Sequence, residues 1–201
     1  SKKFNFPSKC PSCGSNTVKE FNLTTKKKDA VTRCLDLKFD CKEILREKLK
    51  HLVSKDALNI DGFGKKIIQK FWDLNMIKYP ADIFNLNFKR ISSFDGWGDL
   101  STFNLKKAIE KSQTTSLDKF IFAIGIRHIG QENAKILAKY FVNIKKFEEL
   151  FDKSKRKKIL YYLLELDGIG ETQINSLENF FSNSNNINNT INLIRKLNIT
   201  D

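Results

Sequence analysis

The sequence lacks the features that would place it in a membrane or mark it for secretion. No apolar run approaches the ~18–20 residues of a membrane span, and no signal-peptide pattern opens the chain. An initiating Met is also missing, so we expect a fragment of a larger protein. A hydrophobic content of 40% over 201 residues suffices for one domain with a core, or for two small domains.

Motifs for independent catalysis are missing as well. The chain has no Walker-type glycine-rich loop, no H-E-x-x-H and no plausible Ser/His/Asp set, and it contains two histidines in all. We therefore expect no catalytic residues in this chain.

Acidic residues are outnumbered. The chain has 36 Lys and Arg against 23 Asp and Glu, for a net charge of +13, and residues 1–59 hold 14 basic and 7 acidic side chains. Such an excess favours a polyanionic partner, because bound phosphates release counterions. The abundance of Lys, Asn, Ile and Phe is also what an AT-rich genome produces, so charge alone leaves both explanations open.

Cysteine is confined to the first 41 residues, where four occur with the spacing C-x2-C-x20-C-x6-C. They are Cys10, Cys13, Cys34 and Cys41. Without a secretory signal, this pattern indicates a metal rather than disulfides. Four thiolates suit tetrahedral structural zinc, and Gly14 permits a tight knuckle after the first pair. The second arm is wider than usual, so an unligated Cys41 is the alternative.

Four short segments share one pattern, in which an apolar residue leads into a glycine-bearing turn that opens an apolar-periodic helix. They are residues 60–64, 94–98, 126–130 and 166–170. Their third residues are spaced by 34, 32 and 40 positions, a period that marks a repeated supersecondary unit. Their central apolar residues are predicted to fill the core between two helices, and these are Phe63, Trp97, Ile129 and Ile169.

A turn of this kind presents backbone N–H groups at a helix N-terminus, which suits a phosphate. Glycine at both outer positions removes Cβ and allows φ > 0, so a phosphate can approach closely. Such contacts carry no base readout, so we expect sequence-independent binding. A single Gly-x-Gly is more often a plain turn, but four at a regular period favour phosphate contacts. The predicted contact residues are Gly62, Gly64, Lys65, Lys66, Gly96, Gly98, Arg127, His128, Gly130, Gly168 and Gly170.

The four segments differ in charge. Two lysines follow the first (65–66), and the third carries Arg127 and His128, so these two are the better predicted phosphate contacts. Asp99 and Glu171 follow the second and fourth, where an acid can stabilise a helix N-terminus. His128 replaces a glycine, either as a phosphate donor or as a tolerated turn residue.

The remaining pattern is helical. Apolar residues at i, i+3, i+4 and i+7 predict a helix over 134–141, and further helices are predicted over 41–52, 117–124 and 159–166. The Asn/Ser-rich stretch 182–190 is predicted as a loop or the start of a linker, and no alternating run requires a large sheet. We expect a mainly α chain behind a small zinc finger.

Six motifs together extend along nearly the whole chain. They are C-P-x-C-G at 10–14, R-C at 33–34, H-L-V-S at 51–54, residues 57–64, P-A-D-I-F-N-L at 80–86 and F-A-I-G-I-R-H-I-G at 122–130. In these motifs and their order, the chain resembles the zinc-finger and helix-hairpin-helix region of a bacterial NAD-dependent DNA ligase. The resemblance implies a four-cysteine zinc finger and connecting helix (1–50), four helix-hairpin-helix motifs in two paired units (51–190), and a C-terminal helix or linker (191–201).

The resemblance further implies that the four cysteines bind structural Zn²⁺ and that the hairpins hold nicked double-stranded DNA by the minor-groove side of its backbone. NAD and Mg²⁺ would act only in the intact enzyme. Its adenylation and OB-fold domains would precede residue 1, and a BRCT domain would follow residue 201. A monomeric, cytoplasmic, nucleoid-associated protein of replication and repair is expected, with no membrane partner. Leu100 stands where many relatives have lysine, which weakens the second hairpin as a DNA contact.

The nucleophile motif K-x-D-G of nucleotidyl-transferring ligases is absent. Three Asp-Gly pairs occur, but the positions two residues before Asp are Asn59, Ser93 and Glu165. Nick-sealing chemistry is therefore expected outside this fragment. The alternatives are a helix-hairpin-helix module of another repair or recombination protein, which the zinc arms disfavour, and a hairpin-type glycosylase, which the scarcity of proline (three residues) disfavours.

Overall fold

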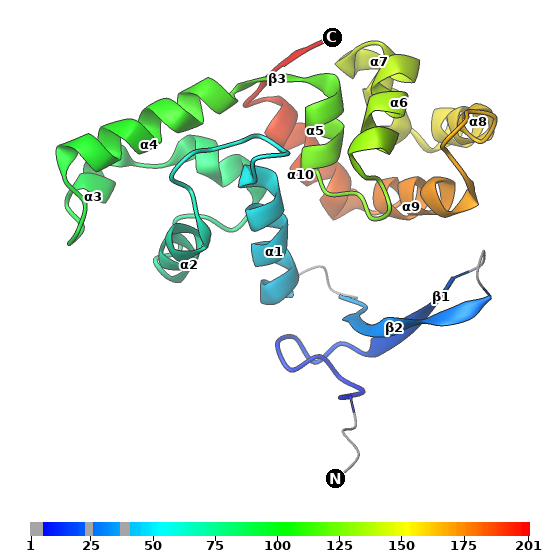
Figure 1. Cartoon of the computed structure of the whole chain (residues 1–201), viewed down its shortest axis with the longest axis horizontal. Helices are drawn as coiled ribbons and strands as arrows, with labels where there is room; N and C mark the ends of the chain where they lie inside the picture. Colours follow the sequence, from blue (N-terminus) through cyan, green and yellow to red (C-terminus); the bar gives the residue numbers. More distant parts are fainter. Residues whose placement is uncertain (1–5, 23–25, 37–40) are drawn as a thin grey trace. The chain divides into compact units, whose positions relative to one another are not determined.

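The computed structural model describes residues 6–22, 26–36 and 41–201. It divides into two compact units, residues 1–47 and 48–201. Helix α1 (Lys42–Val53) begins in the first unit and ends in the second. The fold is mainly α, as predicted, and the first unit contains a small β ribbon (Figure 1). In the part of the chain described, no helix is long and apolar enough to cross a membrane.

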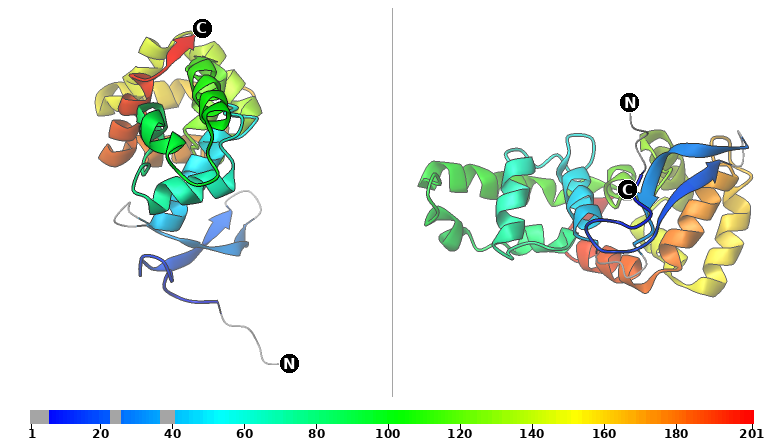
Figure 2. Two further views of the ribbon diagram at one scale, coloured as in Figure 1. Left: turned by 90° about the vertical axis from the view of Figure 1, so that its left-hand side faces the viewer. Right: turned by 90° about the horizontal axis from the view of Figure 1, so that it is seen from below.

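The first unit is built on an antiparallel ribbon of β1 (Thr17–Asn22) and β2 (Lys27–Cys34), drawn in blue in Figure 2. Thr17 pairs with Cys34 at one end, and Phe21 pairs with Lys28 nearer the turn. The register shifts between these pairs because β2 contains extra residues there. A bulge of this kind bends a ribbon without changing which strands pair.

The second unit consists of short helices joined by tight turns, as Figure 1 shows. Its elements after α1 are α2 (Lys65–Asp73), η1 (Pro80–Asn85), α3 (Phe88–Ser92), α4 (Asp99–Ser112), β3 (Thr114–Ser116), α5 (Leu117–Ala123), α6 (Gln131–Phe141), α7 (Ile144–Glu148), η2 (Glu149–Phe151), α8 (Lys153–Leu163), α9 (Glu171–Phe181), α10 (Ser184–Ile194) and β4 (Asn198–Thr200). The predicted helices at 117–124 and 134–141 are thus confirmed.

A cluster of phenylalanines occupies the core between the later helices. Phe147 on α7 is fully buried, and its ring meets the rings of Phe120, Phe141 and Phe181 edge to face at 6.0, 5.3 and 5.7 Å. Edge-to-face geometry adds to the stability gained from apolar burial. The five-residue helix α7 therefore holds α5, α6 and α9 together through one side chain.

The predicted loop over 182–190 is wrong, because α10 covers most of it. The side chain of Asn183 accepts the backbone N–H of Asn186 at 3.0 Å and so caps the helix. Leu193 is buried on the inner face, and the Thr190 hydroxyl donates to the Asn186 carbonyl at 2.8 Å. The cap and this buried face outweigh the low helix propensity of asparagine.

The C-terminal residues pair with a strand from the middle of the sequence. Strand β4 pairs in parallel with β3, so that Ile199 lies opposite Thr115. Gln113 reinforces the pairing, since its side-chain amide donates to the Lys196 carbonyl at 3.0 Å and its own carbonyl accepts from Asn198 at 2.7 Å.

Arg156 on α8 is a buried cation that the sequence pattern did not predict. Its side chain is 3% exposed, and Nη1 donates to the carbonyls of Leu150 and Phe181, both at 2.9 Å. Its Nε donates to Glu178 at 3.1 Å. Burial raises the pKa of Glu178, but hydrogen bonds from Ser182 and Arg156 outweigh it and hold that pKa below its usual value. One guanidinium thus joins η2 to the end of α9.

We predict that Arg156→Met lowers the free energy of unfolding by about 2–4 kcal/mol, because two buried carbonyls lose their donor. The matched control is Lys155→Met on the same helix, whose side chain is 57% exposed and whose ammonium lies 3.6 Å from Glu149. An exposed pair of this kind contributes at most about 1 kcal/mol. Urea unfolding followed by circular dichroism measures both variants, and equal losses would show that Arg156 has no special role.

Candidate metal centre and hairpin surface

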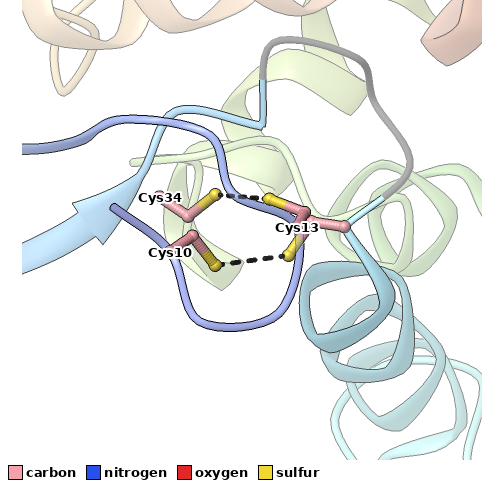
Figure 3. Close-up of side chains that lie close together, drawn as sticks. Cys10, Cys13 and Cys34 are labelled. Carbon is pink, nitrogen blue, oxygen red and sulfur yellow. Dashed lines mark hydrogen bonds between the residues drawn. The ribbon is translucent and has the colours of Figure 1, made fainter. Parts of the chain in front are cut away.

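The four cysteine sulfurs of the first unit converge on one point. All four Sγ atoms lie within 4.8 Å of one another. The Sγ atoms of Cys10 and Cys41 are 3.9 Å apart, and those of Cys13 and Cys34 are 3.4 Å apart (Figure 3). Sulfurs bound tetrahedrally to a metal at about 2.3 Å lie about 3.8 Å apart. The cluster therefore has the size and ligand type of a metal site, and it includes Cys41 despite the wide second arm.

The knuckle around the first pair is closed by two backbone hydrogen bonds. The N–H of Gly14 donates to the Cys10 carbonyl, and the N–H of Cys10 donates to the Ser15 carbonyl, both at 2.8 Å. Gly14 has φ +73°, a conformation that glycine adopts without strain. The predicted role of Gly14 in the knuckle is confirmed.

Asp36 joins the second pair of cysteines and was missed in the sequence. Its backbone N–H donates to Cys34 Sγ at 3.2 Å, and its carboxylate accepts the backbone N–H of Cys41 at 2.8 Å. This buried carboxylate therefore fixes the backbone that carries one sulfur, as groups behind the ligands of metal centres commonly do. An Asp two residues after a cysteine, inside an unusually wide arm, was the available indication.

The thiols differ in acidity. Hydrogen bonds from Ser15 lower the pKa of Cys13 to about 7, whereas burial raises the pKa of Cys34 to about 12. The protein alone therefore does not ionise all the thiols at neutral pH. A divalent cation supplies the positive charge that ionises its thiol ligands.

The four hairpins of the second unit share one backbone geometry. In each, the N–H of the fourth residue donates to the carbonyl of the first, at 3.2, 3.0, 3.1 and 3.0 Å in chain order. The third residue has positive φ in each, and these residues are Gly62 (+78°), Gly96 (+77°), His128 (+58°) and Gly168 (+88°). This combination is typical of a type II turn.

The fourth residue of each hairpin enters the core, as predicted. Phe63, Ile129 and Ile169 are at most 5% exposed, and Trp97 packs partly buried with its ring 5.8 Å from that of Phe71. The residues on either side of this apolar residue are exposed in all four hairpins. Each hairpin therefore buries its fourth residue and exposes the residue on either side of it.

The expectation of positive φ at both outer positions is wrong for the second one. Gly64, Gly98, Gly130 and Gly170 are helix N-caps with φ between −76° and −115° in extended backbone. A Cβ added at Gly64, Gly98 or Gly130 would meet nothing within 4 Å. The chain's own packing thus does not require glycine there.

His128 takes the left-handed position of the third hairpin. Its Nδ1 lies 3.1 Å from the hydroxyl of Ser176 on α9. His128 is therefore a turn residue that also contacts the helix of the fourth hairpin, which leaves any additional role toward phosphate as a proposal.

Asn133 on α6 connects the third hairpin to the fourth. Its Oδ1 accepts the N–H of Gly130 at 3.3 Å, and its Nδ2 donates to the Gly168 carbonyl at 2.8 Å. The third residue of the helix thus closes its own hairpin and reaches the neighbouring one.

Gln173 on α9 makes the same connection in the opposite direction. Its Oε1 accepts the N–H of Gly170 at 3.1 Å, and its Nε2 donates to the His128 carbonyl at 3.5 Å. Both amides lie three residues after the last glycine of their hairpin. Together they fix the spacing of the third and fourth hairpins, and the repeat comparison in the sequence missed them.

The first pair of hairpins is connected differently. Lys70 on α2 donates to the carbonyl of Asp95 in the second hairpin at 3.3 Å. Beside the first hairpin is a cavity of about 370 Å³ whose lining includes Lys50, Lys55 and Lys65. Asp61 also lines this cavity, so its charged side chains, three lysines and one aspartate, leave a net positive charge beside the turn.

The comparisons with known proteins agree with this geometry. The helix-hairpin-helix motif model matches residues 119–190, which include the third and fourth hairpins. The chain is similar to proteins named DNA ligase: it is 51% identical to that of Pelagibacter ubique over 93% of this chain, 42% to that of Ehrlichia canis over 99%, and 39% to that of Parvibaculum lavamentivorans over 92%. It covers 27%, 29% and 27% of their lengths. The predicted resemblance to a DNA ligase region is thereby confirmed.

We predict that the purified chain contains about one equivalent of zinc and that Cys34→Ser lowers this content sharply, because a tetrahedral site needs four ligands. Elemental analysis measures it. Val31→Ala, an exposed position on the same strand, serves as the control and should retain the metal. Full zinc content in Cys34→Ser would exclude the four-cysteine site.

Proposed function

We propose that this chain is the DNA-gripping segment of an NAD-dependent DNA ligase that seals nicks in replication and repair in the bacterial cytoplasm. The observation that carries the proposal is the shared hairpin geometry, with a buried fourth residue between two exposed residues at the start of a helix. The names of the relatives support the ligase assignment, and the helix-hairpin-helix match supports the binding mode.

The physical basis is the exposed N-terminus of the helix after each hairpin. The first N–H groups of a helix lack intrahelical partners and carry partial positive charge, which favours a phosphate. The last glycine of each hairpin has no side chain to keep a phosphate away, although the fold leaves space for one in three of the four. The space that a side chain would occupy at these glycines is therefore free for an external ligand.

The proposed contacts are the exposed hairpin residues and their adjacent cations. They are Gly62, Gly64, Lys65, Lys66, Gly96, Gly98, Arg127, His128, Gly130, Gly168 and Gly170. Since these groups reach the backbone and no base edge, the partner is double-stranded DNA of any sequence. The first and third hairpins make the stronger contacts, because lysines or Arg127 lie beside them, whereas Asp99 and Leu100 follow the second.

In the proposed assignment, the metal at the cysteine cluster is structural Zn²⁺. A metal with four thiolate ligands has no open position for a substrate, so its contribution is to stabilise the first unit. NAD and Mg²⁺ would serve the adenylation domain of the intact monomeric enzyme, where a lysine is adenylated, AMP passes to a 5′-phosphate and a 3′-hydroxyl completes the seal. This chain would supply only the grip on DNA.

The DNA contact is tested by Gly64→Val and Gly130→Val. Both positions are extended and have space for a Cβ, so the variants should stay folded and lose about 1 kcal/mol or less, because valine is a poorer N-cap than glycine. Duplex affinity should fall about tenfold or more, because a charge-assisted contact contributes roughly 1.5–3 kcal/mol. Fluorescence anisotropy with a labelled nicked duplex measures the affinity. The same substitution at Gly98 is the matched control and should have a smaller effect. Variants that unfold instead would mean that these turns are structural.

The division of labour is tested by incubating the chain with radiolabelled NAD. No covalent lysyl-AMP should form, because the K-x-D-G motif is absent. The positive control is a complete NAD-dependent ligase treated in parallel. If this chain retains radiolabel after denaturation, the proposal that DNA binding and adenylation lie in different parts of the enzyme is wrong. This holds whatever the outcome of the binding test.

A further inference from the structure

The ribbon of the first unit exposes two phenylalanines that the zinc site does not use. Phe21 on β1 is 54% exposed and Phe6 is 59% exposed. The ammonium of Lys19 lies over the Phe6 ring, 5.3 Å from its centroid. We call Phe6, Lys19, Phe21 and Lys28 the aromatic–lysine strip.

Three residues of the strip, Lys19, Phe21 and Lys28, share one face of the ribbon, and Phe6 joins them through its contact with the Lys19 ammonium. Lys19 and Phe21 are two residues apart in β1 and both exposed, whereas Glu20 between them is half-buried. Alternate residues of a strand share a face. Lys28 lies directly opposite Phe21 in the register, and directly paired side chains project from the same face. Lys27 pairs with Asn22 and therefore belongs to the other face.

The charge of the ribbon is complementary to a polyanion. Residues 17–34 contain five Lys or Arg and two acidic residues. A protein partner docking on the two rings would have to desolvate the lysines beside them, which costs free energy unless each is paired. A nucleic acid supplies a phosphate for each ammonium and an aromatic face for each ring.

We propose that the aromatic–lysine strip binds single-stranded DNA. Its phenylalanine rings stack on unpaired bases, and Lys19 and Lys28 contact the adjacent phosphates. An intact duplex hides its base faces in the stack, so the strip discriminates against the form that the hairpins hold.

The proposal predicts that the whole 201-residue chain binds a labelled oligothymidylate of about 12 nucleotides, a length typical of such grooves. Phe21→Ala should weaken this binding about fivefold or more, since stacking on one ring contributes at least that factor. Its control is Val31→Ala, an exposed apolar residue in the irregular part of β2. Lys28→Gln should weaken binding more than Lys27→Gln, because the same change in charge falls on opposite faces.

Duplex binding and zinc content, measured on the same variants, separate this proposal from the hairpin contacts. Phe21→Ala should retain both, and Gly64→Val should lose duplex affinity but keep oligothymidylate binding. Equal losses in Lys27→Gln and Lys28→Gln, or an unchanged affinity in Phe21→Ala, would overturn the proposal. If Phe21→Ala instead abolishes self-association in sedimentation without affecting oligothymidylate, the strip is a protein interface.

Discussion

The second unit depends on the burial of one apolar side chain in each hairpin, that of the fourth residue. Full burial of a side chain such as Phe63 or Ile129 stabilises a fold by about 1.5–3 kcal/mol. The N–H of this residue closes a type II turn, and a type II turn needs positive φ at the residue before it, which explains Gly62 and the left-handed backbone of His128. With this residue buried, the residues directly before and after it face solvent. The same packing that holds two helices together therefore exposes the next helix N-terminus.

Pairs of hairpins are held at a set distance by different interactions in the two halves. In the later pair, Asn133 and Gln173 each satisfy a backbone N–H of their own turn and a carbonyl of the other. In the earlier pair, the ring contact of Phe71 with Trp97 and a bond from Lys70 take this role. Amide bridges have directional geometry, whereas ring contacts tolerate small shifts. In the function we propose, a rigid pair would suit two phosphates at a fixed separation along one groove.

The local pattern predicted most of the fold because hairpins, their buried fourth residues and amphipathic helices each depend on residues that are close together in the sequence. The spacing of the four cysteines likewise predicted that they form one metal site. What the sequence could not show depends on contacts between segments distant in the chain. Arg156 looked like one of many surface cations, and its burial follows from carbonyls six and twenty-five residues away. Asn133 has meaning only beside Gly168, and α10 was missed because its cap and buried face outweigh an asparagine-rich composition.

The space beside the last glycine of a hairpin also indicates whether folding or binding requires glycine at that position. Where glycine serves the fold, as at Gly168, an added Cβ would lie 2.7 Å from Ile136 and meet positive φ. At Gly64 neither condition holds, so a larger side chain would cost the folded chain little. Glycine is a fair N-cap, so folding partly explains its presence there, but folding gives no reason for the two lysines beside a bare backbone at a helix start. In the function we propose, a phosphate that comes within hydrogen-bond distance of that backbone accounts for all three features.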